Sequence, residues 1–485
     1  MKMRLNREEY YNKVKGCWIG KNIGGTIGAP FEGTHDMPEI EGYTTPKGQP
    51  LPNDDLDLQL VWLNALRDVG PRGVDANVLA DYWLTHITPH WGEYGICKGN
   101  MFAGLLPPLC GEYRNDWKNS NGAWIRSEIW ACVCPGIPDI AVKYAIDDAC
   151  IDHGRSEGTY AEIFTAVLES LAFVESDINT LIQKALDYIP ETSRLARSVN
   201  IVIDGYKSGE DWKVVRNRVV EDNVHDLDWF MAPANVAFVV LGLLYGEGDF
   251  KKSMIYTVGC GDDTDCTAAT CGAIMGIMSG ADAIPEDWKE YIGDTIVTKC
   301  INASYIYTID GYANIADTCT ELTKRVVEMM PKVMDAFDIK AELVDGNTEY
   351  DFDVNSTIYK GYAKRAMAKS PYSFEITTSP HTGVYVEYEK APEIKAGETF
   401  KIKAYVYNKR RDSHQVEARV LLPEGWSATY PRGFILHNQG FKKSGFWWEM
   451  DVTANENVNA VNKIDIIFDS TLNAVPVSVP LVLFG

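Results

Sequence analysis

The spacing of apolar residues divides the chain into a helical part and a strand-forming part. Up to about residue 335, apolar residues recur at intervals of three and four, the period of an amphipathic helix. Pro190, Pro233 and Pro285 stand where helices are expected to begin or end. The pattern predicts an all-helical domain over residues 1–340, and it is clearest at 160–174, 179–188, 233–245 and 321–337.

From residue 372 the apolar period changes to two. About seven short strands follow, a number typical of an immunoglobulin-like β-sandwich. Pro476 and Pro480 predict that the last strand lies at a sheet edge, because proline has no N–H to donate. We therefore expect a polar connecting segment at 341–370 and an accessory sandwich domain at 371–485. The predicted strands are 372–377, 384–388, 400–407, 416–422, 446–452, 463–466 and 475–484.

Two glycine stripes interrupt the helical part. A glycine at every fourth position lines one face of a helix with hydrogen atoms. Each glycine lowers helix propensity by about 1 kcal/mol relative to alanine, a cost that close backbone packing can offset. Lys15, Lys21, Asp265 and Asp282 are too polar for membrane spans, so we expect two buried helices pressed together. The stripes consist of Gly16, Gly20, Gly24 and Gly28, and of Gly272, Gly276 and Gly280.

Acidic residues stand next to both stripes. Carboxylates that a fold brings close together repel one another, and a bound cation relieves this repulsion. All-oxygen ligands favour a hard ion, Mg²⁺ or Mn²⁺. The alternative is that each cluster only caps its own helix. We expect one metal centre built from Glu32, Asn53, Asp54, Asp55, Asp263 and Asp265.

Charge and cysteine content narrow the possible partners and compartment. The net charge of −22 disfavours nucleic acid and anionic membranes as partners. Residues 1–9 contain no apolar core of a secretion signal, and the eleven cysteines are an odd number. We therefore expect a cytoplasmic protein with reduced thiols. Soft-metal binding at Cys132 and Cys134, or around Cys266, is the alternative, although neither group has the spacing of a zinc site.

Five motifs occur in a fixed order between about residues 10 and 300, and together they resemble the ADP-ribosylglycohydrolase family, which includes the enzyme that reactivates dinitrogenase reductase. The resemblance implies a compact all-helical domain that holds one or two Mg²⁺ or Mn²⁺ ions. It also implies a small-molecule glycoside or an ADP-ribosylated substrate. The motifs are Gly16 to Glu32, Asn53-Asp54-Asp55-Leu56, Asn121-Gly122-Ala123-Trp124-Ile125-Arg126, Asp152-His153 and Asp262-Asp263-Thr264-Asp265-Cys266.

The resemblance assigns roles to individual residues. Glu32 is the expected acid/base, and Asp55 a second catalytic candidate. The expected metal ligands are Glu32, Asn53, Asp54, Asp55, Asp263 and Asp265, and the expected substrate contacts are Asn121, Gly122, Trp124, Arg126 and His153. For two residues a structural role stays open: His153 as a core histidine, and Arg126 as the ion-pair partner of Glu128.

The chain departs from the family pattern at two metal positions. Asn53 and Cys266 each stand where the family has a threonine. An amide oxygen still binds a hard ion, but a neutral thiol is a poor ligand for magnesium. One of the two metal positions is therefore expected to be weak, manganese-preferring or empty. These departures favour an altered substrate.

A concentration of tryptophans bears on the substrate. Five of the thirteen lie within fifty residues. The glycine-rich stretch 90–130, which holds four of these five, predicts a pocket rim rather than a plain helix. Their flat faces suit stacking on a nucleobase or a sugar ring, and core packing is the alternative. They are Trp83, Trp91, Trp117, Trp124 and Trp130.

Three functions remain open from the sequence. The first is a metal-dependent glycohydrolase acting on an ADP-ribosyl bond or on a non-nucleotide glycoside. The second is a non-catalytic module that binds ADP-ribose or a sugar through a degraded metal site. The third is a structural protein that keeps only the fold. Glu32 and the four aspartates favour the first, because a scaffold without a cation gains stability by losing them.

Overall fold

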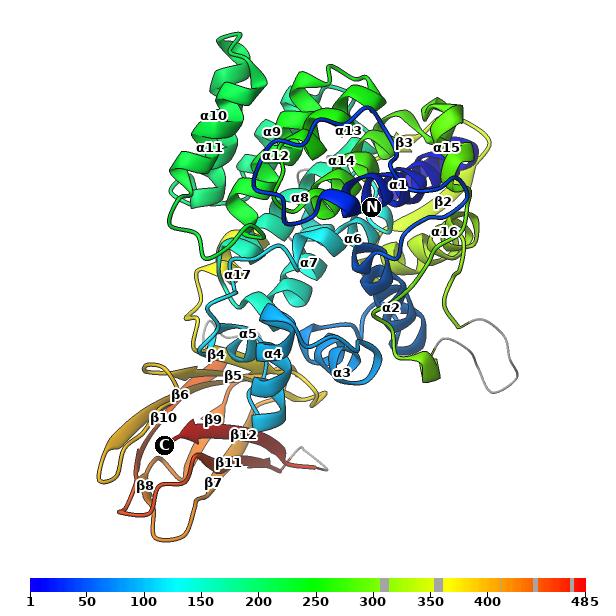
Figure 1. The fold of residues 1–485 in the computed structure, drawn as a ribbon. Coiled ribbons are helices and arrows are strands. Elements are labelled where there is room, and N and C mark those ends of the chain that lie inside the picture. Colours follow the sequence, from blue (N-terminus) through cyan, green and yellow to red (C-terminus); the bar gives the residue numbers. More distant parts are fainter. Residues whose placement is uncertain (306–313, 353–360, 411, 439–443, 472–474) are drawn as a thin grey trace. The chain divides into compact units, whose positions relative to one another are not determined.

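The computed structural model describes residues 1–305, 314–352, 361–410, 412–438, 444–471 and 475–485. These residues form two compact units (Figure 1). The first comprises Met1–Tyr94 and Asp116–Ala368, and the second Gly95–Asn115 and Lys369–Gly485. The first unit is mainly helical and the second contains two antiparallel sheets, in agreement with the predicted multidomain fold class.

Helices make up most of the first unit. The four segments in which the apolar period is clearest are all helical, as predicted. The helices are α1 (Arg7–Gly28), α2 (Asp54–Val69), α3 (Ala76–His86), α6 (Glu128–Cys132), α7 (Pro138–His153), α8 (Glu157–Ala172), α9 (Ile178–Leu186), α10 (Arg194–Lys207), α11 (Trp212–Asp222), α12 (Ala232–Tyr245), α13 (Phe250–Gly259), α14 (Thr264–Ser279), α15 (Glu286–Ile292), α16 (Cys319–Ala336) and α17 (Tyr362–Met367).

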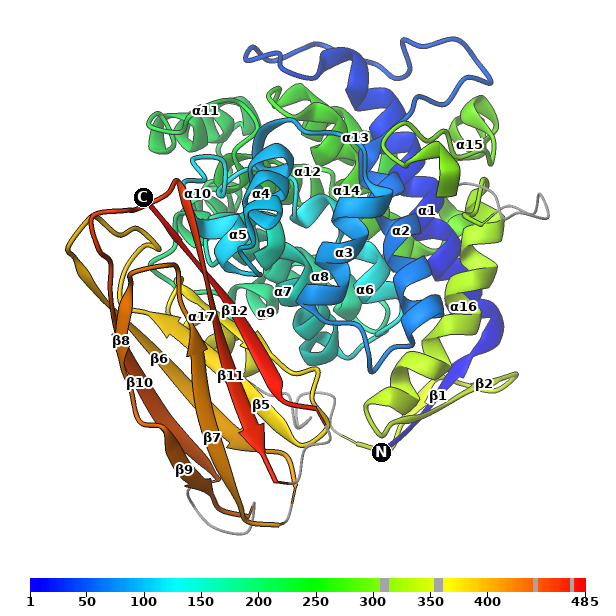
Figure 2. The same ribbon diagram turned by 90° about the horizontal axis from the view of Figure 1, so that it is seen from below.

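Helices α1 and α14 lie against each other backbone to backbone (Figure 2), as the glycine stripes predict. A Cβ atom added to Gly20 would lie 2.0 Å from the carbonyl oxygen of Gly272. One added to Gly24 would lie 2.0 Å from the carbonyl oxygen of Ala268, so alanine replaces glycine on that side. Gly280 has a different role from the other glycines of its stripe: it ends α14 with a φ of 79°, a left-handed conformation that favours glycine.

This helix pair determines where the acidic residues lie. Close to the end of α1, the Thr264 hydroxyl donates a hydrogen bond of 2.8 Å to the carbonyl oxygen of Gly28. The last turn of α1 is therefore adjacent to the first turn of α14. The short 3₁₀ helix η1 (Ala29–Phe31) follows α1 and ends at Glu32. Glu32 consequently lies next to Asp263 and Asp265.

The first unit also contains a small sheet, so the expectation of an all-helical domain over 1–340 is only partly correct. Strand β1 (Lys2–Asn6) pairs in parallel with β2 (Lys340–Val344) and antiparallel with β3 (Glu349–Tyr350). Met3 and Leu5 of β1 are buried. Buried and exposed residues alternate in β1 over only five positions, too few to predict a strand from sequence. Its partner strands β2 and β3 lie at or within the predicted connecting segment, which also contains α17.

The second unit is built around a β-sandwich. One sheet has the strand order β4-β5-β6-β10-β8 and the other β12-β11-β7-β9. Trp448 and Phe468 meet edge to face between the sheets, with ring centroids 5.3 Å apart. Strand β12 lies at a sheet edge, as Pro480 within it and Pro476 just before it predict. The strands are β4 (Ser373–Ile376), β5 (Thr382–Tyr388), β6 (Thr399–Asn408), β7 (His414–Leu421), β8 (Ser427–Thr429), β9 (Gly433–Leu436), β10 (Gly445–Thr453), β11 (Val461–Ser470) and β12 (Val477–Phe484).

Two short helices complete the second unit. The first residues of helix α4 (Gly92–Ala103) are assigned to the first unit and the rest to the second, to which α5 (Leu109–Glu112) also belongs. The glycine-rich stretch 90–130 is therefore partly helical. All eleven cysteines are buried and none forms a disulfide, in agreement with the predicted thiols. Among the described residues, no helix combines the length and the apolar character that a bilayer crossing needs.

Candidate active site

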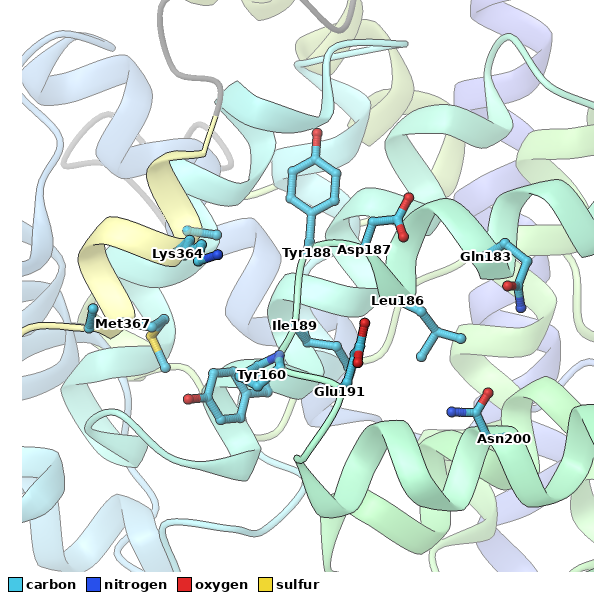
Figure 3. A pocket seen from close by; sticks show the side chains of 13 residues that line it. Tyr160, Gln183, Leu186, Asp187, Tyr188, Ile189, Glu191, Asn200, Lys364 and Met367 are labelled. Atoms are coloured by element: carbon cyan, nitrogen blue, oxygen red, sulfur yellow. The ribbon is translucent and has the colours of Figure 1, made fainter.

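One cavity of the first unit, of about 760 Å³, lies away from the acidic motifs. Figure 3 shows that its lining comes from α8, α9, α10 and α17. Tyr160, Asp187, Glu191 and Lys364 are among the side chains around it. None of the described residues that line this cavity was predicted as a site residue. It therefore gives no support to the predicted chemistry.

A second cavity, of about 340 Å³, is lined by residues at the end of η1 and at the starts of α2, α4 and α14, among others. Several predicted site residues line it from segments far apart in the sequence. The ends of several helices thus bring acidic and aromatic side chains together around one opening. The lining residues are Glu32, Asp54, Trp91, Gly92, Glu93, Tyr94, Asn121, Gly122, Ile125, Trp229, Phe230, Asp263, Asp265, Cys266 and Lys299.

The carboxylates of this cavity have the arrangement of a cation site. Oxygen atoms of Glu32, Asp263 and Asp265 lie within 4.8 Å of one another. One oxygen of Asp263 accepts a hydrogen bond of 2.7 Å from the Asn121 amide. The buried Asp263 Oδ1 and Asp265 Oδ1 have no hydrogen-bond partner among the described residues. Buried carboxylate oxygens without donors fit a hard divalent ion, which these residues can hold.

Burial and neighbouring charges raise the pKa of two carboxyl groups of the cavity, Glu32 and Asp54. Glu32 is solvent-accessible at the cavity mouth, yet partial burial and the charges of Asp265 and Asp54 raise its pKa to about 7. Burial and the charge of Asp265 also raise the pKa of Asp54. Lys299 lowers the pKa of both groups, but less than these effects raise it. A carboxyl group with a pKa near 7 exchanges protons at neutral pH.

Asp55 and Asn53 are buried and are not among the described residues that line the cavity. Asp55 is fully buried, and its Oδ2 faces the Lys21 ammonium at 3.6 Å. Its Oδ1 accepts a hydrogen bond of 3.5 Å from the thiol of Cys266. Asn53 Oδ1 accepts a hydrogen bond of 2.8 Å from the backbone N–H of Asp55 and so caps α2. For Asn53 this is the capping arrangement that the sequence left as the alternative.

The residues expected to contact substrate occupy two different environments. Asn121 and Gly122 line the cavity. Trp124 is buried behind it and donates a hydrogen bond of 2.9 Å from its indole N–H to Asn121 Oδ1. Arg126 and His153 are fully buried and are not part of the described lining. The structure therefore brings two of the five to the cavity surface and places one directly behind them.

Arg126 belongs to a buried ion-pair network. Its guanidinium contacts Asp148 at 2.9 Å and Asp152 at 2.8 Å. The alternative partner expected from the sequence, Glu128, is wrong, because Glu128 instead pairs with Lys21 at 2.6 Å. Two carboxylates about one helical turn apart on α7 are better placed for the guanidinium than a neighbour two residues away.

Sequence reasoning missed several residues of the cavity wall. Trp229, Phe230, Tyr94 and Lys299 lie outside every motif, and only their place in the fold brings them to the cavity. Of the five predicted tryptophans, only Trp91 lines it, with 51% of its surface exposed. Trp83, Trp124 and Trp130 are fully buried, which is the core packing that the sequence left as the alternative.

Comparison with known proteins identifies relatives of the helical part. Human (Homo sapiens) ADP-ribosylhydrolase ARH3 is 22% identical over 230 residues, which cover 41% of this chain and 62% of the human protein. This chain thus spans less than two thirds of that relative. ADP-ribosylhydrolase ARH3 of Bos taurus is 21% identical over 262 residues, covering 49% of this chain and 67% of the bovine protein.

A solved structure, "ADP-ribosylglycohydrolase-related protein complex", aligns with a TM-score of 0.46 and 17% identity, over 67% of this chain and 100% of that chain. The sequence model of the ADP-ribosylglycohydrolase family matches residues 6–327. This match covers more than half of the chain, including both acidic clusters and both glycine stripes. The chain therefore belongs to the ADP-ribosylglycohydrolase family.

Proposed function

We propose that this protein is a metal-dependent glycohydrolase that cleaves an ADP-ribosyl or related N- or O-glycosidic bond. The observation that carries the proposal is the convergence of Glu32, Asp263 and Asp265 around one cavity, where two buried carboxylate oxygens have no described hydrogen-bond donor. With Asp54 at the same opening, these residues would hold the ion. When bound there, Mg²⁺ or Mn²⁺ supplies the positive charge that orients sugar hydroxyls and stabilises developing negative charge.

Glu32 is the proposed general base. At the cavity mouth it is accessible to water, and its pKa of about 7 leaves a large fraction ionised at neutral pH. It takes a proton from a water molecule as the water oxygen bonds to the anomeric carbon. The bonding electron pair leaves with the aglycone through an oxocarbenium-like state. Nearby carboxylates stabilise the positive charge of that state.

Two further residues position the site. Asn121 donates to Asp263 and accepts from Trp124, so its amide has one orientation and fixes that of the carboxylate. At Gly122, an added Cβ atom would lie 2.2 Å from Glu93 Oε1. Glycine at this position therefore lets Glu93 reach the cavity.

The aromatic wall supports two substrate classes. Trp91, Trp229 and Phe230 present apolar faces that stack equally well on a nucleobase and on a sugar ring. The family favours an ADP-ribosyl group. The wall also favours a second candidate, a non-nucleotide glycoside, because a stacked sugar needs no phosphate contact. Among the described residues that line this cavity, Lys299 is the one lysine or arginine. A diphosphate group would therefore find few cationic partners there.

A substrate panel tests the proposal. We expect Mn²⁺-dependent hydrolysis of an ADP-ribosylated peptide, a nucleoside or an aryl glycoside by the wild type, and loss of hydrolysis on chelation. Glu32→Gln is expected to reduce turnover at least about 100-fold, whereas the exposed Glu41→Gln is expected to leave it unchanged. Metal-dependent ligand binding without turnover would favour the binding module. Neither turnover nor binding would favour the structural protein.

A further inference from the structure

The acidic centre has two halves that share Asp265. We call Glu32, Asp263 and Asp265 the cavity half, and Asp55, Asp265 and Cys266 the inner half. In each half, one candidate ligand atom per residue lies within 4.8 Å of the others. Geometry alone thus offers room for two neighbouring ions, the number that the sequence left open.

A lysine reaches the inner half from α1. Lys21 is fully buried, and its ammonium lies 2.6 Å from Glu128 Oε1 and 3.6 Å from Asp55 Oδ2. The other oxygen of Glu128 accepts a hydrogen bond of 2.8 Å from the Gln59 amide. Two buried carboxylates thus face the ammonium, an arrangement that suits a charged lysine.

The partners of the two halves differ. Both oxygens of Asp55 already face a protein group, Oδ2 the ammonium and Oδ1 the Cys266 thiol. In the cavity half, Asp263 Oδ1 and Asp265 Oδ1 face no described donor. An ammonium beside Asp55 repels a divalent ion at that carboxylate, and a neutral thiol does not attract Mg²⁺. Asp55 Oδ2 also has no hydrogen-bond donor among the described residues, but it faces a fully buried ammonium. The lysine at the cavity, Lys299, is exposed. A divalent ion therefore meets less repulsion at the cavity half than at Asp55.

We propose that Lys21 is the built-in cation of the inner half, so that the acidic centre takes a single divalent ion, at the cavity half. In this arrangement Asp55 acts as a positioning residue: it holds Cys266 at the start of α14, next to Asp265. The inference rests on the metal requirement of the proposed function, but not on the identity of the substrate.

Metal stoichiometry tests the proposal without substrate. After equilibration with excess Mn²⁺ and gel filtration, we expect one Mn²⁺ per wild-type chain by elemental analysis and an uncoupled Mn²⁺ electron paramagnetic resonance spectrum. Two bound ions with a magnetically coupled spectrum in an otherwise active wild type would overturn this inference and leave the proposed function intact. No bound ion would overturn both.

A variant tests whether the lysine charge sets the stoichiometry. Lys21→Met alone leaves two buried carboxylates unpaired and is expected to unfold easily. Lys21→Met combined with Glu128→Gln removes both charges of the closest pair and keeps similar volumes. We expect this double variant to bind a second Mn²⁺, with a coupled spectrum. Lys15→Met, on the same helix but not fully buried, is expected to stay at one ion. A single ion in the folded double variant would overturn the role of Lys21.

Discussion

The Thr264 hydroxyl at the start of α14 donates a 2.8 Å hydrogen bond to the carbonyl oxygen of Gly28 at the end of α1. This contact joins the two helices where their acidic neighbours meet. Because the helices approach backbone to backbone, Glu32 after α1 and Asp265 in α14 surround one cavity. Packing of the two glycine stripes is therefore a condition for the chemistry of the site.

Gly20→Ala tests that condition. The added Cβ atom would lie 2.0 Å from the carbonyl oxygen of Gly272, so the helices must separate. We expect the free energy of unfolding to fall by at least about 2 kcal/mol and Mn²⁺ binding to weaken, as measured by thermal denaturation with and without metal. Gly99→Ala is the control, because it lies within α4 with nothing within 4 Å of its added Cβ. Equal stability of Gly20→Ala and the wild type would contradict backbone contact.

Stability of the metal-free protein is expected to depend on pH. The pKa of Glu32 is raised from 4.5 to about 7, and burial raises that of Asp57 from 3.8 to about 7, despite hydrogen bonds from the backbone N–H groups of Lys299 and Cys300. Between pH 4.5 and 7 the folded state therefore binds more protons than the unfolded state. Stability consequently falls as pH rises through this window.

Denaturation in the presence of a chelator, in steps from about pH 5 to pH 8, measures this dependence. Asp57→Asn is expected to flatten the curve of stability against pH. The substitution replaces one of the two carboxyl groups of raised pKa with an amide, which does not titrate. A melting temperature that rises over the same interval in chelator would show that these carboxyl groups do not carry raised pKa values.

Arg126→Met distinguishes a structural role of Arg126 from substrate binding. The substitution leaves Asp148 and Asp152 buried without their cation, so we expect a loss of about 3–5 kcal/mol in unfolding free energy. Arg114→Met removes an exposed ion pair with Glu393 and is expected to cost about 1 kcal/mol or less. A stable Arg126→Met protein with weakened substrate binding would instead assign Arg126 to the substrate.

The double substitution Asp54→Ala, Asp263→Ala tests whether the two acidic clusters share an ion. An ion that binds only the folded state raises its melting temperature by mass action. We expect millimolar Mn²⁺ to stabilise the wild type and to have no effect on the double variant. An equal rise in both proteins would place the stabilising ion elsewhere.

Local sequence predicted the parts of this fold that are governed by periodicity and backbone contact. Glycines at every fourth position, such as Gly20, imply close helix packing, and this packing was predicted from them. The acidic residues at Asp54 and Asp263 repel one another when a fold brings them together, so one acidic centre was predicted as well. Strand β1 was missed because it has only five residues and forms by pairing with 340–344, more than 300 residues later in the chain.

Side chains brought together only by tertiary structure were beyond local reasoning. Trp229, Phe230 and Lys299 belong to no motif, yet they line the cavity. The partners of Lys21 and Arg126 likewise come from other helices, and burial rather than sequence spacing selects them. Predicted roles for Trp124 and His153 in substrate binding stay predictions, since both side chains are buried behind the surface.

The most direct test of the central claim is anomalous scattering from crystals of the wild-type protein soaked in Mn²⁺. The account predicts one anomalous peak in the cavity, at coordination distance from carboxylate oxygens of Glu32, Asp263 and Asp265. Absence of a peak there from well-ordered, fully soaked crystals would contradict it, as would a peak located only elsewhere in the chain.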